Sequence, residues 1–265
     1  MMEIFNRKLL NIKQNNLAFN YANYNFVKKE VVSNVLDRLY DVKIDFKNAL
    51  DIGCSIGEVA DYLKNTSKIQ SLTQIDECQA MLDQNIYPNK ILSDLQNISL
   101  PENSFDLIIS IFALHNINDL SKMFTKIYNL LTYGGLFVCS LPIVGTLAEL
   151  EQALMQSEIE LYSGFSPRIH PFSDLTTLGN LLQSTKFKNI IADKDSLSIM
   201  YKNPYNIFKD LKHSLQGNIL NNKNNNIVSK AFFPKVISNL SSFIDEESQH
   251  YKISIVYCNL IAWKE

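Results

Sequence analysis

Residues 49–57, Ala-Leu-Asp-Ile-Gly-Cys-Ser-Ile-Gly, have the composition of a buried strand that turns at glycines into a helix. Such a turn aims backbone N–H groups and a helix N-terminus at a ligand lying over the end of the strand. Asp76 follows a second apolar run, about 20 residues beyond the glycines, where a carboxylate can accept hydrogen bonds from ribose hydroxyls. The spacing therefore predicts a site for a cofactor that contains a nucleoside.

The charge of Asp51 separates two kinds of nucleoside ligand. A carboxylate at the end of the first strand repels the pyrophosphate of a dinucleotide, whereas it attracts a cationic centre. Ser55 stands where many such loops have a third glycine, so the backbone has less freedom there. We therefore expect an amino-acid-bearing nucleoside, with Asp51 near its charged end.

Other polar residues are candidates for the same edge of the molecule. Asp94 follows the third predicted strand and is interpreted either as an acceptor for an adenine amino group or as a solvated loop acid. His115 follows the fourth strand, and general base, helix cap and packing against the cofactor all remain open for it. Arg168 and His170 lie in a proline-flanked loop at 164–172 and are either substrate-side groups or loop structure.

The elements that must position these residues alternate between strand and helix. Apolar runs predict strands at 46–52, 71–75, 91–94, 105–112 and 136–141. Helical spacing predicts helices at 28–40, 57–65 and from 120 to the Tyr133-Gly134-Gly135 stop. This alternation indicates right-handed crossovers and a parallel sheet. The second half predicts helices at 147–161 and 175–182, strands at 189–192, 197–201 and 251–263, and a polar surface loop at 221–226.

Composition excludes several classes of protein. With 265 residues, 46% of them hydrophobic, the chain can form one large α/β core. A net charge of −2 argues against a dedicated nucleic-acid binder. The four cysteines are isolated, which argues against a zinc site or disulfide framework and fits a reducing compartment such as the cytoplasm. No apolar run reaches about 18 residues, and the first residues lack a secretory apolar segment, so neither a membrane span nor a signal peptide is expected.

These motifs resemble those of the class I S-adenosylmethionine-dependent methyltransferases. Residues 50–57 are similar to the first motif of that family, Asp76 to its ribose-binding acid, and Asp94 with Leu95 to its adenine-binding position. Residues 100–108 and 131–137 are similar to its fourth- and fifth-strand signatures. The resemblance implies S-adenosyl-L-methionine as cofactor and an α/β, Rossmann-like, seven-stranded, mostly parallel sheet with helices on both faces and an antiparallel last strand. The cofactor-binding residues it implies are Asp51, Gly53, Cys54, Ser55, Gly57, Asp76, Asp94, Leu95 and Ser110.

A narrower resemblance extends nearly from end to end. Residues 4–7, 36–41, 114–120 and 164–172 are similar to mitochondrial complex I assembly factors that act as arginine hydroxylases, and more loosely to malonyl-acyl-carrier-protein O-methyltransferases of biotin synthesis. Asn116 stands where these relatives usually carry tryptophan or a bulkier residue, which would reshape the substrate pocket.

This second resemblance implies a single methyltransferase-like domain. Its parts would be an N-terminal helical segment at 1–45, a cofactor-binding core at 46–141, and at 142–265 the last strands with a substrate-side cover made by 145–185 and 203–245. It implies a protein or acyl-carrier substrate, a complex I subunit among the candidates, with His115 and Arg168 as catalytic residues and no metal. Methyl transfer and side-chain hydroxylation both suit such a pocket, and the alternative from another class is a non-enzymatic assembly module.

Overall fold

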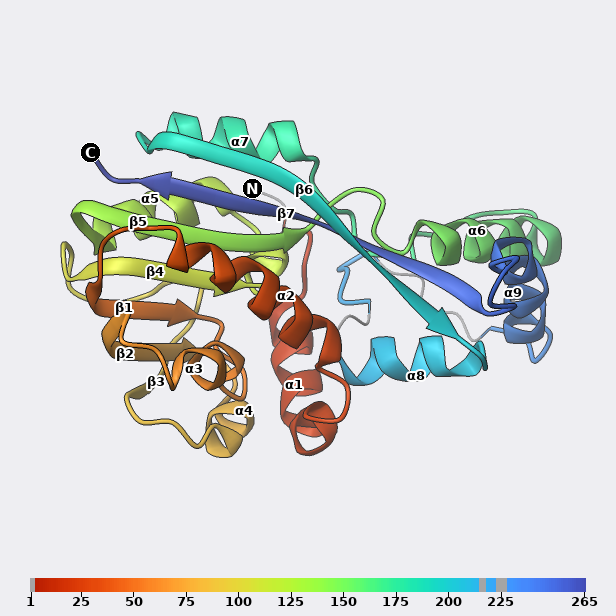
Figure 1. The fold of residues 1–265 in the computed structure, drawn as a ribbon. Helices are drawn as coiled ribbons and strands as arrows, with labels where there is room; N and C mark the ends of the chain where they lie inside the picture. The colour runs from red at the N-terminus through yellow and green to blue at the C-terminus, as the bar shows by residue number, and fades with distance from the viewer. Residues whose placement is uncertain (1–2, 215–217, 223–227) are drawn as a thin grey trace.

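The structure, a computed structural model, describes residues 3–214, 218–222 and 228–265 (Figure 1). Its centre is a seven-stranded sheet with the order β3-β2-β1-β4-β5-β7-β6. The strands are β1 Phe46–Ile52, β2 Ile69–Asp76, β3 Lys90–Leu92, β4 Phe105–Ile111, β5 Leu131–Pro142, β6 Lys188–Tyr201 and β7 Tyr251–Trp263. Neighbours among β1 to β5 are parallel, and β7 runs antiparallel to both β5 and β6. The predicted sheet and its antiparallel last strand are confirmed.

The strand order reverses between β1 and β4, which are neighbours at the centre of the sheet. Ile52 pairs with Ile75 of β2, and Asp51 pairs with Ile109 of β4, so the three strands end at one edge. The carboxyl edge at such a reversal is where open α/β sheets bind ligands. The loops that follow β1, β2 and β4 therefore meet at the place where a site is expected.

Helices cover both faces of the sheet (Figure 1). On one face lie α5 Leu120–Leu130 and α7 Leu175–Ser184; on the other lie α2 Phe26–Leu36 and α3 Glu58–Leu63. Successive residues of β4 face opposite sides of the sheet: Ile108 packs with α5, while Leu107 and Ile109 pack with α2 and α3. Burial on both faces explains the continuous apolar run of this strand.

The remaining helices surround the carboxyl edge. The helix α1 Arg7–Tyr21 packs on α4 Gln79–Gln84 through a cluster that includes Ala18, Tyr21 and Met81. The outer ends of β6 and β7 extend beyond the sheet toward α6 Ala148–Tyr162, α8 Tyr205–His213 and α9 Phe232–Leu240 (Figure 1). A separate apolar cluster joins these strands to the three helices. Short 3-10 turns occur at Asp37–Tyr40, Leu114–Asn116 and Ser241–Phe243.

Three local predictions were wrong. The strands expected at 189–192 and 197–201 are one continuous strand, β6, whose charged middle residues are tolerated because the strand forms an edge of the sheet. Tyr133-Gly134-Gly135 lies inside β5 and does not end the preceding helix, since the strand begins at Leu131. The helix α7 packs on a face of the sheet beside α5, whereas a place over the carboxyl edge was expected for it. Most of the loop expected at 221–226 falls on 223–227, outside the described residues.

The four cysteines are buried and carry free thiols. Among the described residues, no cluster of His, Cys, Asp or Glu is suited to hold a metal ion. In the same part of the chain, no helix combines the length and apolar character needed to cross a membrane.

Candidate functional site

The loop after β1 has an unusual backbone. Gly53 has φ +79° and Gly57 has φ +95°, while Ser55, which is not a glycine, also lies in the left-handed region with φ +50°. A side chain at Gly53 would bring a Cβ atom to 2.2 Å from the Cβ of Ala113, in the segment after β4. Glycine is required at 53 by this close approach within the protein as well as by its φ angle.

Two hydrogen bonds from Lys28 hold this loop from the side of α2. The Lys28 Nζ donates to the carbonyl of Gly53 and to the hydroxyl of Ser55, each at 2.9 Å. It also lies 3.7 Å from a carboxylate oxygen of Glu58, and both side chains are buried. Glu58 accepts a further hydrogen bond from the Asn25 amide at 2.8 Å. The cation therefore joins the glycine loop to the first residue of α3.

Asp51 is buried one residue before the end of β1, close to that charge. Its Oδ2 atom has no hydrogen-bond partner among the described residues. Burial raises the pKa of Asp51 to about 7, although the nearby Lys28 ammonium acts in the opposite direction. Burial alone would lower the pKa of Lys28, but Glu58 and the other anionic groups around it raise that pKa above its ordinary value. A permanently charged cation and an acid that titrates near neutrality thus lie side by side.

Asp76 ends β2 with a buried carboxylate that binds the adjoining backbone. Its two oxygens accept hydrogen bonds from the backbone N–H groups of Ser55 and Cys78, each at 2.9 Å. The pKa of Asp76 lies above its ordinary value, because the effect of burial exceeds the opposite effect of these two hydrogen bonds. Each oxygen keeps a second lone pair for a ligand. Asp76 therefore fixes the loop after β1 and is also available as an acceptor.

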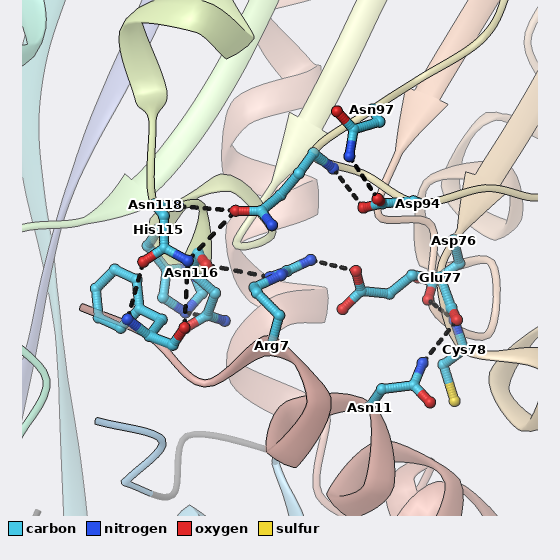
Figure 2. Close-up of polar contacts among 12 residues, drawn as sticks. Arg7, Asn11, Asp76, Glu77, Cys78, Asp94, Asn97, His115, Asn116 and Asn118 are labelled. Atoms are coloured by element: carbon cyan, nitrogen blue, oxygen red, sulfur yellow. Dashed lines mark hydrogen bonds and ion pairs between the residues drawn. The ribbon is translucent and has the colours of Figure 1, made fainter. Parts of the chain in front are cut away.

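The N-terminal segment lies over the ends of β2 and β4. Figure 2 shows Arg7 between Glu77 and Asn116, donating to the carboxylate of the first and the backbone carbonyl of the second. Asn11 donates to the Glu77 carbonyl at 2.8 Å, and the Phe5 N–H donates to the Asn118 side chain at 2.9 Å. The first helix is thereby attached to both strand ends.

These elements enclose one large cavity at the carboxyl edge. It holds about 1100 Å³ of empty space, counting the solvent at its mouth. One end is lined by the loops after β1 and β2 together with α1 and the start of α2. The other end is lined by the outer parts of β6 and β7 and by α8. The cavity therefore connects the region beside the glycine loop with a second region beneath the cover.

The residues predicted to bind a cofactor fall into three groups. Gly53, Ser55, Asp76 and Leu95 line the cavity. Four others are buried behind its wall: Asp51, Cys54, Gly57 and Ser110. The Ser110 hydroxyl donates a hydrogen bond to the carbonyl of Ile52 at 2.9 Å. Asp94 is exposed and accepts hydrogen bonds from Gln96 and Asn97, as expected of a loop acid, and it is not among the lining residues (Figure 2).

The predicted catalytic residues lie elsewhere. His115 faces a second hollow, together with His170, and its ring centroid is 5.4 Å from that of His170. The Asn116 side chain contacts both rings and also lines the large cavity, so it separates His115 from that cavity. Burial lowers the pKa of His170 to about 4, which keeps the ring neutral.

Arg168 is held by α6. Its Nε donates to Glu158 at 2.7 Å, and its guanidinium lies 4.7 Å from the centre of the Phe232 ring. Glu158 also accepts from the backbone of Ser166 at 2.7 Å. Burial acts to raise the pKa of Glu158, but the hydrogen bonds from Ser166 and Arg168 lower it below its ordinary value. These contacts anchor the 164–172 loop to the cover, and Arg168 does not line the large cavity.

Four charged residues that line the cavity were missed by sequence reasoning: Arg7, Lys28, Glu77 and Asp210. Two of them, Lys28 and Asp210, could have been found from the sequence. Each lies in phase with the apolar face of its own helix: Lys28 with Val31, Val32 and Val35, and Asp210 with Ile207 and Leu211. A charge at a core-facing position is the signal that identifies both residues.

Comparison with known proteins identifies the family of this chain. Residues 50–139 match the model of a methyltransferase domain. The chain is 32% identical to "Arginine-hydroxylase NDUFAF5, mitochondrial" of Rattus norvegicus, covering 99% of this chain and 78% of that protein. It spans 60–66% of the length of the NDUFAF5 relatives from mouse, human, zebrafish and Dictyostelium discoideum. It is 23% identical to the malonyl-[acyl-carrier protein] O-methyltransferase of Gallionella capsiferriformans, covering 90% of this chain and 84% of the other.

Solved structures show the same fold. The YcgJ protein of Bacillus subtilis matches with a TM-score of 0.60 at 14% identity, covering 88% of this chain and 98% of that one. The phosphoethanolamine N-methyltransferase 2 of Haemonchus contortus, in complex with S-adenosylhomocysteine, matches with a TM-score of 0.52 at 18% identity, covering 89% of this chain and 52% of that one.

Proposed function

The chain belongs to the S-adenosylmethionine-dependent methyltransferase family that includes the arginine-hydroxylase NDUFAF5, and on this basis we propose that it is an enzyme that modifies a side chain of a protein. S-adenosylmethionine is the cofactor of this family. When bound, it supplies an electrophilic methyl group on a positively charged sulfur. A complex I subunit is the proposed protein partner, because the NDUFAF5 protein of Rattus norvegicus aligns with 99% of this chain.

The charges at the carboxyl edge suit this cofactor. Asp51, buried behind the cavity wall, makes this end of the cavity negative and so favours the ammonium group of the amino-acid end. Lys28 would hold the carboxylate of that end, and Asp76 would accept from the ribose hydroxyls. The apolar side chain of Leu95 would pack against the adenine. The negative charges of Asp51 and Asp76 favour a zwitterionic nucleoside over a pyrophosphate, which they would repel.

The observation that carries the proposal is the continuity of the cavity. The same hollow that begins at Gly53 and Asp76 continues to Ile199, Ile207 and Ile255 under the cover. An extended side chain that enters from the cover would bring its end toward the cofactor region. Walls of this kind exclude water and align an acceptor, which is the main requirement for a transfer reaction.

Methyl transfer to a malonyl thioester is the second candidate, supported by the similarity to malonyl-[acyl-carrier protein] O-methyltransferase. The cytoplasm is the proposed compartment, and the mitochondrion is the alternative. Isolated buried cysteines suit a reducing compartment such as the cytoplasm, while the NDUFAF5 relatives are named as mitochondrial.

Calorimetry of the purified protein with S-adenosylmethionine tests the first part of the proposal. Binding is expected in the wild type and is expected to be at least about tenfold weaker in Asp76→Ala. Lack of binding to the wild type would refute the proposal.

Mass spectrometry of candidate protein substrates tests the second part. Methylation adds the mass of one methylene group, and hydroxylation adds that of one oxygen atom, so the two reactions are distinguished directly. Product on a malonyl thioester alone would favour the second candidate. Cofactor binding without product on either substrate class, including complex I subunits, would indicate a non-enzymatic assembly module.

A further inference from the structure

One face of α8 closes the far end of the cavity. Its lining residues are Ile207, Asp210 and Leu211, which recur at intervals of three and four residues, with Ser214 following directly after the helix. Residues at these intervals share one side of a helix. Asp210 is thus a half-buried carboxylate within an otherwise largely apolar stripe that faces the cavity.

The cavity wall around Asp210 carries both polar and apolar residues. Tyr201, at the end of β6, forms a side-chain hydrogen bond with Asp210, and burial raises the pKa of this tyrosine above its ordinary value. It therefore stays a neutral donor at physiological pH. The nearby walls come from Ile199 of β6 and Ile253 of β7. The carboxylate has oxygen lone pairs beyond those used by a single hydroxyl.

The arginine and the lysine that line the cavity, Arg7 and Lys28, both lie at its other end. Arg7 forms an ion pair with Glu77, and Lys28 forms one with Glu58. Within the part of the chain that the structure describes, no lysine or arginine forms an ion pair with Asp210. Among the described residues, Asp210 is therefore a negative charge without a paired cation at the far end of the cavity.

We propose that Asp210, together with Tyr201, binds the positively charged head of the substrate side chain, a guanidinium or an ammonium group, and so determines substrate specificity. This inference rests on the proposed function. A side chain with an apolar stem and a cationic end matches isoleucine walls that lead to one carboxylate. A malonyl thioester would place its own carboxylate beside Asp210 and would be repelled. The charge at this end thus favours a cationic protein side chain over the malonyl candidate.

Three small probes test the preference in the presence of S-adenosylhomocysteine. The first two are Nα-acetylarginine amide and Nα-acetyllysine amide, which distinguish guanidinium from ammonium; the third is Nα-acetylcitrulline amide, a neutral isostere of the first. We expect a cationic probe to bind the wild type at least about tenfold more tightly than the citrulline probe, as measured by ligand-detected NMR. In Asp210→Asn this preference is expected to disappear, and Asp210→Glu is expected to restore part of it. A malonyl-N-acetylcysteamine thioester is the anionic probe and is expected to bind weakest.

Matched controls separate this inference from the proposed function. Asp83→Asn removes an equal charge from an exposed position on α4 and should leave the preference unchanged. Binding of S-adenosylhomocysteine is measured for the wild type and for every variant. A wild-type protein that does not bind it would refute the proposed function. Two outcomes, each with normal S-adenosylhomocysteine binding, would refute the role of Asp210 alone. One is tighter binding of the malonyl probe than of the cationic probes by the wild type. The other is an unchanged preference for the cationic probe in a folded Asp210→Asn protein. Thermal melting establishes that the variants are folded.

Discussion

Replacing Lys28 with methionine is the sharpest test of the charge arrangement at the carboxyl edge. Methionine keeps the apolar stem but removes the ammonium group that contacts Gly53, Ser55 and Glu58. Glu58 would then be a buried carboxylate without a counter-charge, and it would keep the hydrogen bond from Asn25. We expect both folding and cofactor binding to suffer, for reasons that can be separated.

The size of the stability effect follows from the burial of the pair. Removing one partner of a buried ion pair costs about 3–5 kcal/mol, because the other charge is left uncompensated. The 3.7 Å separation and the remaining bond to Asn25 place Lys28→Met at the lower end, about 3 kcal/mol. For a chain of this size, each kcal/mol shifts the melting temperature by roughly 2–4 °C, so a decrease of about 6–12 °C is expected.

A second substitution distinguishes the ion pair from simple loss of packing. Lys28→Met with Glu58→Gln removes both charges, and is expected to recover at least half of the lost stability, since an uncharged pair needs no counter-ion. Both proteins are measured by thermal melting and chemical denaturation at neutral pH. Cofactor affinity is expected to stay at least about tenfold reduced in the double variant, because the cation for the cofactor carboxylate is still missing. A single variant as stable as the wild type, or a double variant no better than the single one, would refute the reasoning.

Three further predictions concern individual carboxylates and the loop under the cover. The pKa of Asp51 is about 7 in the folded chain, above its unfolded value of 3.8, so the unfolded state releases the proton first and folding stability falls as the pH rises between these values. Asp51→Asn is expected to flatten that slope, as measured by denaturation across the range. Asp76→Ala is expected to lower the free energy of unfolding by about 3 kcal/mol as well as the cofactor affinity, because two buried N–H groups lose their acceptor; wild-type stability would contradict this role. Arg168→Ala is expected to lower the melting temperature through the unpaired Glu158 while calorimetry finds cofactor affinity unchanged, and a tenfold loss of affinity would argue against its place outside the cavity.

The parts of the fold set by local sequence were predictable. The strand, glycine turn and helix around Gly53 follow from residues that are adjacent in the chain, and the registers of β1, β2 and β4 then bring Asp76 to the same loop. Lys28 and Asp210 were missed because their place in the cavity wall depends on which surface a helix packs against, and that is decided by contacts distant in sequence. His115 follows the expected strand, but Asn116 lies between it and the large cavity, so His115 lines another hollow.

The middle of β6 shows a different reason for failure. Asp193, Lys194 and Asp195 break the apolar pattern, yet they pair in register with β7 because backbone hydrogen bonds make the ladder regardless of side-chain polarity. Strand prediction from hydrophobic alternation is weakest at the edge of a sheet, where neither face needs to be fully buried. The cover could not be placed for the related reason that its position depends on how far β6 and β7 extend.

The attachment of the first helix has a kinetic consequence. Residues of α1 and of the start of α2 line the cofactor end of the cavity, and Arg7 and Asn11 tie α1 to the end of β2. The segment before the helix also pairs with Leu220 near the cover. A ligand enclosed in this way can leave when these contacts open together, so exchange of spent for fresh cofactor is expected to be slower than the chemical step. Turnover would then show a rapid first cycle followed by a slower steady rate.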